Sequence, residues 1–405
     1  MINITDKQNC CGCGACVQKC PKQCISFHED NEGFLYPQVD ATICIDCGLC
    51  EKVCPMLNPA EARKPLQVLA AINKDEKIRM ESSSGGIFTL LAEKIINEGG
   101  VVFGARFDEE WQVTIDYTET IEGLAAFRGS KYVQARTGES FKQCEQFLKE
   151  GRKVLYTGTP CQISGLKHYL TRDYDNLFTV DIVCHGVPSP IVWDAYLKNK
   201  CIEIAKDNSL ECLTLSNVTR VDFRNKRNGW LKYGIFIETD VFNDSGKRTA
   251  CFEQKDKNLY LTAYLRNAFL RPSCYNCKAK DGRSLSDITV ADFWGVKEEY
   301  PKFYDVLGVS CVLLHNSHGS NLYKQVNAKS LNVELNTFIK HNPTYSKNTQ
   351  YPERRKKFWR IYFNSGAKDA LKKTSIAPLK ERVRYSIIRI IVNLGLYDLI
   401  KRATK

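Results

Sequence analysis

Residues 10–21 read CCGCGACVQKCP, and residues 44–55 read CIDCGLCEKVCP. Both stretches follow the spacing C-x2-C-x2-C-x3-C-P, which is typical of bacterial two-cluster ferredoxins. Cysteines at intervals of three allow one tight loop to present three thiolates to the same side of an iron–sulfur cluster. Gly12, Gly14 and Gly48 allow the backbone to approach that cluster closely. The two stretches therefore predict a 2[4Fe–4S] ferredoxin-type domain over residues 1–58.

In two-cluster ferredoxins the fourth cysteine of each run binds the cluster of the other run. This rule assigns the first [4Fe–4S] cluster to Cys10, Cys13, Cys16 and Cys54. It assigns the second cluster to Cys44, Cys47, Cys50 and Cys20. Cys11 and Cys24 receive no ligand role. The alternative is structural zinc, whose usual signature is two separated C-x2-C pairs. Two complete runs, each ending in proline, favour iron–sulfur clusters.

The chain has 405 residues, enough for two or three domains, and 19 cysteines. Ten of the cysteines lie before residue 55, which is unlike a disulfide framework spread through a small secreted protein. The first residues show no basic segment followed by an apolar one, so no secretory signal is predicted. No uncharged apolar run is long enough for a spanning helix. These features predict a cytoplasmic protein.

After Pro55 a polar, proline-bounded linker leads into alternating apolar strands and amphipathic helices. Segments such as VLAAIN, VVFGARFD and KVLYTG have the pattern of buried strands followed by helices. This rhythm predicts a larger α/β domain over residues 66–340. Residues 213–239 alternate aromatic and β-branched side chains and predict an antiparallel insert. The predicted fold class of the whole chain is therefore α+β.

The last 60 residues, 346–405, form a basic tail with 16 Lys or Arg against 4 Asp or Glu. This excess equals the formal net charge of +12 of the whole chain. Residues 382–394 predict a basic amphipathic helix, which can make peripheral contact with an anionic membrane or dock on a partner. The alternative is a terminal helix packed on its own domain. No recognised motif accompanies the charge, so nucleic-acid binding is not expected.

Four further cysteines occupy suggestive positions in the predicted α/β domain. They are Cys161 in YTGTPCQ, Cys184 in DIVCHG, and Cys274 and Cys277 in RPSCYNCKAK. Together they can supply a third [4Fe–4S] site, although free cysteines are often simply buried. Residues 82–86, SSSGG, precede a predicted helix, and free N–H groups there suit an anion such as a flavin pyrophosphate. A helix cap without a ligand is the alternative at that position.

Several stretches of the sequence, taken together, resemble those of a known protein family. They are SSSGGIFTLL, FRGSKYV, YTGTPCQISGL, DIVCHGVPSP, VDFRNKRNGW, RPSCYNCKAK and SDITVADFWG. In this order the chain resembles the family of coenzyme F420 hydrogenase/dehydrogenase β-subunits, fused to an N-terminal two-cluster ferredoxin domain. The resemblance implies an FAD-binding domain with its own [4Fe–4S] cluster on Cys161, Cys184, Cys274 and Cys277. It also implies flavin contacts by Ser84, Gly85, Gly86, Ser130, Lys131 and Tyr132.

The expected function is that of an iron–sulfur flavoprotein oxidoreductase. Electrons would pass between the ferredoxin-type clusters and an organic two-electron substrate or coenzyme, F420-like or other, through FAD. The expected partners are a ferredoxin or a redox partner subunit, together with a small-molecule or coenzyme substrate. Lys131 and His185 are the candidate catalytic residues. Arg224, Lys226 and Trp230 are candidates for the substrate entrance.

Two alternatives belong to other classes of protein. The chain can be a non-catalytic electron-transfer subunit of a larger redox complex. Alternatively, Cys161 can be a nucleophile with His185 or His168 as its base, since a helix N-terminus lowers the pKa of a thiol.

Overall fold

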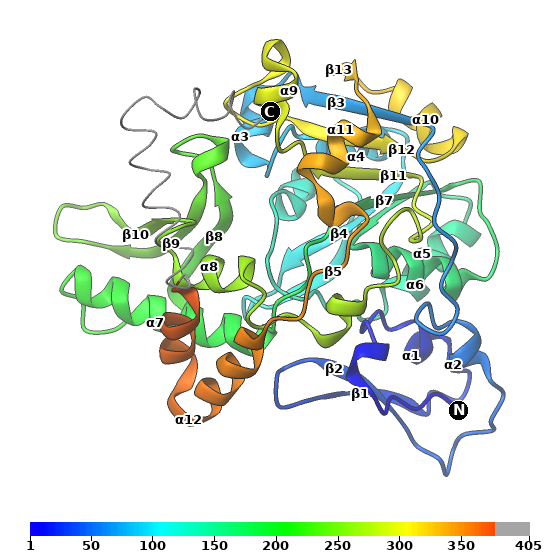
Figure 1. Ribbon diagram of the computed structural model, residues 1–405, viewed down its shortest axis with the longest axis horizontal. Coiled ribbons are helices and arrows are strands. Elements are labelled where there is room, and N and C mark those ends of the chain that lie inside the picture. Colours follow the sequence, from blue (N-terminus) through cyan, green and yellow to red (C-terminus); the bar gives the residue numbers. More distant parts are fainter. Residues whose placement is uncertain (377–405) are drawn as a thin grey trace, which may run out of the picture.

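The computed structural model describes residues 1–376, so the amphipathic helix predicted at 382–394 lies outside the described residues. Within the described part the chain forms three sheets, shown in Figure 1. No helix in this part is long and apolar enough to cross a membrane.

The N-terminal region is small and built around its cysteines. It contains two short helices and one antiparallel hairpin: α1 (Ala15–Lys19), α2 (Leu49–Lys52), β1 (Ile25–Glu29) and β2 (Leu35–Val39). Asp30 closes the hairpin, because its carboxylate accepts the backbone N–H groups of Glu32 and Phe34. Gly14 and Gly48 precede α1 and α2 with φ of 78° and 70°, a backbone region that glycine adopts without strain.

The large sheet has eight strands in the order β13-β3-β12-β11-β7-β6-β4-β5. Their bounds are β3 (Gln67–Asn73), β4 (Val101–Phe107), β5 (Val113–Thr118), β6 (Val154–Gly158), β7 (Leu177–Ile182), β11 (Ile288–Asp292), β12 (Ser310–Leu314) and β13 (Ala328–Asn332). The four central strands, β11, β7, β6 and β4, run parallel. The remaining pairings are antiparallel, so the sheet is mixed.

Helices cover both faces of this sheet. They are α3 (Glu76–Glu81), α4 (Ile87–Asn97), α5 (Ser140–Lys149), α6 (Pro160–Leu170), α9 (Val296–Glu299), α10 (Ser317–Lys324) and α11 (Leu335–His341). Successive strand residues point to opposite faces. Leu155 of β6 accordingly packs with α4 and α10, whereas Val154 and Tyr156 pack with α5 and α6. The hydrophobic core around Val154 and Tyr156 also contains buried cysteines of the N-terminal region. The N-terminal region lies against α6 in Figure 1.

A separate antiparallel sheet lies where the insert is predicted and extends beyond it. It has the order β10-β9-β8, with bounds β8 (Val218–Asn225), β9 (Gly234–Phe242) and β10 (Arg248–Gln254). Its core is shared with three helices: α7 (Pro190–Asp207), α8 (Leu259–Leu265) and α12 (Glu353–Ser375).

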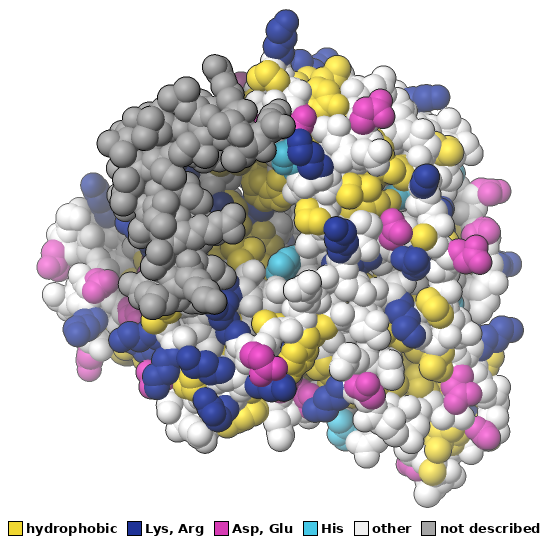
Figure 2. All heavy atoms as spheres, in the orientation of Figure 1, with side chains coloured by type: hydrophobic (Ala, Val, Ile, Leu, Met, Phe, Trp, Pro, Cys, Tyr) yellow, Lys and Arg dark blue, Asp and Glu magenta, His cyan; other side chains and the backbone are white. Residues whose placement is uncertain are grey.

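Helix α12 is the first part of the predicted basic tail, and Lys and Arg side chains gather over it in Figure 2. Its apolar side packs on α7 and α8. Near its start the buried guanidinium of Arg355 pairs with both carboxylate oxygens of Glu32 in the N-terminal hairpin. Arg355 also donates to the carbonyl of Leu270 at 3.1 Å. The C-terminal helix therefore holds the N-terminal region against the main body of the protein.

Candidate redox site

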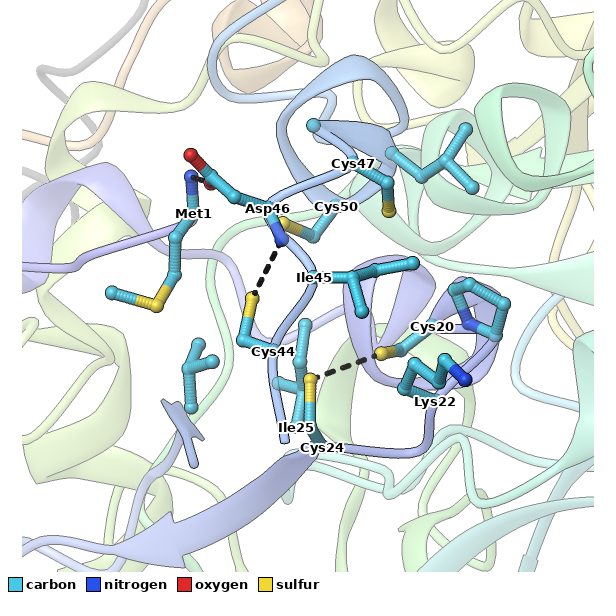
Figure 3. A pocket seen from close by; sticks show the side chains of 14 residues that line it. Met1, Cys20, Lys22, Cys24, Ile25, Cys44, Ile45, Asp46, Cys47 and Cys50 are labelled. Atoms are coloured by element: carbon cyan, nitrogen blue, oxygen red, sulfur yellow. Dashed lines mark hydrogen bonds and ion pairs between the residues drawn. The ribbon is translucent and has the colours of Figure 1, made fainter. Parts of the chain in front are cut away.

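One set of cysteines lies at the surface of the N-terminal region. Figure 3 shows it as a small cavity into which five thiols project; they belong to Cys20, Cys24, Cys44, Cys47 and Cys50. Cys47 is exposed, and the backbone N–H of Asp46 donates to the sulfur of Cys44 at 3.4 Å. Cys20 thus joins the second run, as the crossing rule predicts. The sequence assigns no role to Cys24. Its sulfur lies 3.4 Å from the sulfur of Cys20. We call this set the outer thiol site.

A second set lies on the opposite side, against the main body of the protein. A cavity there is lined by Cys10, Cys11, Cys13, Cys16 and Cys54, and all five are buried. Cys54 thus joins the first run, again as the crossing rule predicts. The hydroxyl of Thr137 donates to the Cys13 carbonyl at 3.0 Å, and the Gln134 amide donates to the Cys11 carbonyl at 3.2 Å. We call this set the inner thiol site.

The electrostatics of the inner thiol site fit a group that carries iron. Burial, together with the neighbouring Cys10 and Cys54, raises the pKa of Cys16 to about 12. Burial likewise raises the pKa of Cys54. Thiols in this position lose their protons only when a cationic group takes the place of the protons and stabilises the thiolates, and all-thiolate ligand sets suit iron–sulfur clusters. In the described part of the chain no three His, Cys, Asp or Glu side chains are close enough together to hold a single metal ion. The spacing of the two cysteine runs and the five thiols gathered at each site fit four-iron clusters.

A third set of thiols comes together from three distant segments. Cys161 lies in the first turn of α6, and Cys184 follows β7. Cys274 lies in the short 3-10 helix Pro272–Asn276, and Cys277 directly follows that helix. Burial raises the pKa of Cys184, and the neighbouring Cys274, Cys161 and Cys277 raise it further. The structure therefore brings Cys161, Cys274 and Cys277 into the surroundings of Cys184, and a cluster held by these four side chains stays a prediction. We call them the third thiol site.

Helix α6 has a strong local reason to begin at Pro160, directly before Cys161. Thr159 and Gln162 form a reciprocal capping box, and Pro160 occupies the first helical position. The backbone that carries Cys161 is therefore fixed by its own sequence. The thiol of Cys161 lies beside Cys11, whose proximity is the main reason that its pKa is raised. The inner and third thiol sites are thus adjacent.

A cavity of about 400 Å³ opens where the parallel strands β6, β7 and β11 end, the usual position for ligands in such sheets. Its walls include Ser82–Ser84, Gly86 and Arg128–Val133. Five of the six predicted flavin contacts line it: Ser84, Gly86, Ser130, Lys131 and Tyr132. Gly85 does not. A side chain on Gly85 would lie 2.5 Å from the carbonyl of Ala71, so this glycine serves the packing of its loop on β3. The volume is within the range of small-molecule and cofactor sites.

The two candidate catalytic residues both line this cavity. The ammonium of Lys131 donates to the carbonyls of Arg128 and Gly129, at 3.1 and 3.3 Å. Burial lowers the pKa of Lys131 to about 7, so its charge needs an anion to stabilise it. His185 bonds to the Asn267 side chain at 2.6 Å, and burial lowers its pKa. Cys184 also lines the cavity, which therefore borders the third thiol site.

Sequence reasoning missed an ion pair in the wall of the cavity. The buried guanidinium of Arg224 donates to both oxygens of Asp292, at 2.9 and 3.1 Å, and to the hydroxyl of Tyr132 at 3.2 Å. It lies over the ring of Tyr233, 3.9 Å from its centroid. In the sequence, Asp292 comes at the end of an apolar strand pattern. That pattern is the one local signal that this carboxylate lies at the edge of the sheet, where the cavity opens.

The prediction that Lys226 and Trp230 lie at the substrate entrance is wrong. Neither side chain lines the cavity. The ammonium of Lys226 is enclosed by the carbonyls of Arg79, Ser84 and Leu307. Trp230 is 1% exposed and stacks on Trp294. Of the three entrance candidates, Arg224 alone faces the cavity.

The geometry does not support Cys161 as a nucleophile. The ring nitrogens of His168 lie 2.7 and 2.9 Å from the carbonyls of Ser164 and Asn58, and His185 is bonded to Asn267. The pKa of Cys161 is raised, whereas a nucleophilic thiol needs a lowered one.

The fold and these thiol sites define an iron–sulfur protein with a ligand cavity beside the sheet. Comparison with known families agrees: residues 9–57 match the 4Fe–4S dicluster domain. The chain belongs to the family of coenzyme F420 hydrogenase/dehydrogenase beta subunits, whose N-terminal model matches residues 68–141 and whose C-terminal model matches residues 151–337.

Individual relatives match over part of their length. A component of the F420H2 dehydrogenase of Methanosarcina mazei is 25% identical over 162 residues, 38% of this chain and 46% of the relative. The coenzyme F420-dependent sulfite reductase of Methanocaldococcus jannaschii is 26% identical over 199 residues, 48% of this chain and 30% of the relative. This chain therefore spans less than half the length of either relative. A chain of the F420-reducing [NiFe] hydrogenase complex from Methanosarcina barkeri superposes with a TM-score of 0.46 at 17% identity, covering 75% of this chain and 94% of that one.

Proposed function

We propose that this protein is an iron–sulfur flavoprotein oxidoreductase that passes electrons between ferredoxin-type clusters and an organic two-electron substrate or coenzyme through FAD. The observation that carries the proposal is the position of Cys184. It belongs to the third thiol site and also lines the cavity beside Lys131. Iron–sulfur clusters exchange single electrons, whereas a flavin exchanges one or two, so the two groups together convert between one-electron and two-electron chemistry.

Each thiol site has a role in this proposal. The outer thiol site, with its exposed Cys47, faces an external one-electron donor, a ferredoxin or a redox partner protein. The inner thiol site is enclosed between the N-terminal region and α6. The third thiol site borders the cavity. The order of the sites from surface to cavity is thus outer, inner and third.

The chain's own groups prepare the cavity for an anionic cofactor. The loop Ser82–Gly86 leads into α4, whose free backbone N–H groups favour a phosphate. Burial lowers the pKa of Lys131 to about 7, and a phosphate or an anionic ring beside this side chain would favour its protonated ammonium form. Tyr132 and Arg224 hold one wall rigid through their hydrogen bond. The substrate class is an organic two-electron acceptor or donor.

The test is the amount of iron, acid-labile sulfide and flavin per chain after purification without oxygen. We expect about twelve irons and one FAD. Replacing Cys274 and Cys277 by serine should lower the iron by about four while the FAD is retained. The exposed Cys212→Ser variant is the matched control and should keep all of its iron. About eight irons and no flavin in the wild-type protein would overturn the proposal.

A second candidate is a non-catalytic electron-transfer subunit of a larger complex. It is favoured by the name of the Methanosarcina mazei relative, which is itself one component of a dehydrogenase, and by the partial coverage of the relatives. The two candidates separate in one assay. Flavin that is reduced by ferredoxin without turnover of any two-electron acceptor by the isolated chain supports the non-catalytic role; turnover supports the oxidoreductase.

A further inference from the structure

Arg271 lies between the inner and third thiol sites and is fully buried, with 0% of its surface exposed. Its Nε donates to the carbonyl of Cys10 at 2.8 Å, and its Nη2 donates to the carbonyl of Leu35 at 2.8 Å. Its Nη1 donates to the side chain of Gln134 at 3.0 Å. Nη2 also lies 3.5 Å from the sulfur of Cys10. The guanidinium therefore touches a predicted cluster ligand directly.

Among the buried arginines of residues 1–376, Arg271 differs in having no carboxylate as its partner. Arg79 pairs with Asp305, Arg224 with Asp292 and Arg355 with Glu32. In the same part of the chain no carboxylate lies within ion-pair distance of Arg271. A buried charge is costly unless an opposite charge balances it. The groups around Arg271 that favour its charge against the cost of burial are the side chains of Cys10, Tyr36, Cys11 and Cys274, and no carboxylate is among them.

The cysteine loop is shaped to admit Arg271. A Cβ on Gly12 would lie 2.9 Å from the guanidinium carbon, and Gly12 has φ of +71°, which a larger residue adopts only with strain. The guanidinium also lies over the ring of Tyr36, with its carbon 4.4 Å from the ring centroid. Arg271 is thus enclosed by backbone, an aromatic ring and sulfur.

The backbone of Arg271 reaches the third thiol site. Its carbonyl accepts the N–H of Cys274 at 3.0 Å, and its own N–H donates to the carbonyl of Val187 at 2.9 Å. The N–H of Val187 in turn donates to the sulfur of Cys274 at 3.4 Å. One residue therefore contacts the inner site through its side chain and the third site through its backbone.

We propose that Arg271 is a positioning residue that links the inner and third thiol sites and supplies the positive charge that favours the electron-loaded state of the clusters bound there. The inference rests on the proposed function, because it requires clusters at both sites. The step it assists moves one electron from the inner site to the third site, so the inner cluster is oxidised and the third is reduced. No bond forms or breaks, and Arg271 keeps its proton and binds no iron. The ultimate donor is the one-electron carrier of the proposed function.

A nearby positive charge makes reduction of a cluster easier, and hydrogen bonds toward sulfur act in the same direction. Removing the charge from Arg271 should therefore lower the reduction potentials of the inner and third clusters. The outer thiol site has no contact with Arg271 and should keep its potential. A shift limited to two clusters is a result that a purely structural role would not give.

The experiment is a redox titration of the full chain, followed by electron paramagnetic resonance, with signals assigned through Cys13→Ser, Cys47→Ser and Cys274→Ser. For Arg271→Met we expect the reduction equilibria of the inner and third clusters to shift at least tenfold toward the oxidised state, 59 mV for one electron. Arg271→Lys, which keeps the charge, should restore most of that shift. Arg152→Met, which removes a charge paired with Glu119, is the matched control and should leave all three potentials unchanged.

Arg271→Gln is the second variant, because it keeps a hydrogen-bond donor for Cys10 and is less disruptive than methionine. It should show the same downward shift. Unchanged potentials in either neutral variant with twelve irons bound would overturn the role of Arg271. Equal shifts at all three clusters, the outer one included, would overturn it as well. A wild-type protein with about eight irons and no flavin would instead overturn the proposed function, so the two failures are distinguishable.

Discussion

The two cysteine runs have the same spacing and opposite surroundings. Cys11 in the first run corresponds to Ile45 in the second, and their exposed fractions are 8% and 58%. Gly12 corresponds to Asp46, and both have positive φ. A Cβ on Gly12 would press on Arg271 and Gln134, whereas Asp46 projects into solvent. The spacing thus sets the shape of the loop, and the residues between the cysteines set which side faces the protein.

The N-terminal region therefore has two distinct sides, one docked on the rest of the protein and one exposed. Its inner side is held by contacts with α6, Arg271 and α12, while its outer side leaves Cys47 exposed. The protein donor of the proposed function would therefore approach the outer side, where Cys47 is exposed. The inner side is the one from which electrons can reach the third thiol site.

The largest expected effect comes from exchanging one ligand on each side. Cys13→Ser and Cys47→Ser should each lose about four irons per chain. Cys13 also packs against α6, because the space beside Gly165 is filled by its Cβ and sulfur. We therefore expect limited proteolysis of the linker at residues 57–66 to accelerate at least tenfold in Cys13→Ser and to change little in Cys47→Ser. Equal cleavage rates in the two variants would show that the inner side is no better docked than the outer one.

The next effect concerns the contact between α12 and the hairpin. Arg355→Met removes the buried partner of the Glu32 carboxylate, which is itself 17% exposed; breaking a fully buried pair costs about 3–5 kcal/mol, and we expect the lower end of that range here. Lys356→Met, one residue away, breaks an exposed pair with Glu353 and should cost under about 1 kcal/mol. The free energy of unfolding in denaturant, measured without oxygen, tests both. A cost below about 1 kcal/mol for Arg355→Met would mean that α12 does not hold the N-terminal region in place.

The features predicted best from the sequence are those that local spacing determines. The two-cluster region is confirmed by the dicluster family match, because four cysteines and a proline in one loop specify it without help from the rest of the chain. The mixed α/β body is confirmed because buried strands and amphipathic helices carry their own periodicity. The residues only suggested the third thiol site, and the family resemblance was needed to support it, because its cysteines come from three segments that are distant in the sequence.

The missed features depend on partners that are distant in the sequence. Arg224 and Asp292 are 68 residues apart, and nothing near either residue identifies the other. Lys226 and Trp230 were placed wrongly because a strand end shows alternation but not which side another element will cover. Arg271 appears in the sequence as one arginine in a cysteine-rich turn. Its importance arises only when the N-terminal region docks on it.

A smaller effect should come from the glycines that precede α1 and α2. Gly14→Ala and Gly48→Ala share the strain of a positive φ, about 1–2 kcal/mol. A Cβ on Gly14 would also lie 2.6 Å from the hydroxyl of Thr137, whereas a Cβ on Gly48 meets no atom within 4 Å. Overpacking adds about 1–3 kcal/mol to the first variant alone. Thermal unfolding of both variants should therefore show the lower midpoint for Gly14→Ala. A lower midpoint for Gly48→Ala would reverse the assignment of the buried side.

The smallest effect is expected when the outer run receives the residue of the inner run. Asp46→Gly relieves the strain of a non-glycine residue at φ 48°, but it also raises the conformational entropy of the unfolded chain. These two contributions have opposite signs, so the free energy of unfolding should change by less than about 1 kcal/mol. The hydrogen bond from residue 46 to the sulfur of Cys44 comes from the backbone and survives the change. Iron content and the potential of the outer cluster should therefore stay at wild-type values. Because the Asp46 side chain is 77% exposed, a lost cluster in this variant would mean that the outer loop depends on its side chains as the inner loop does, and the contrast between the two runs would fail.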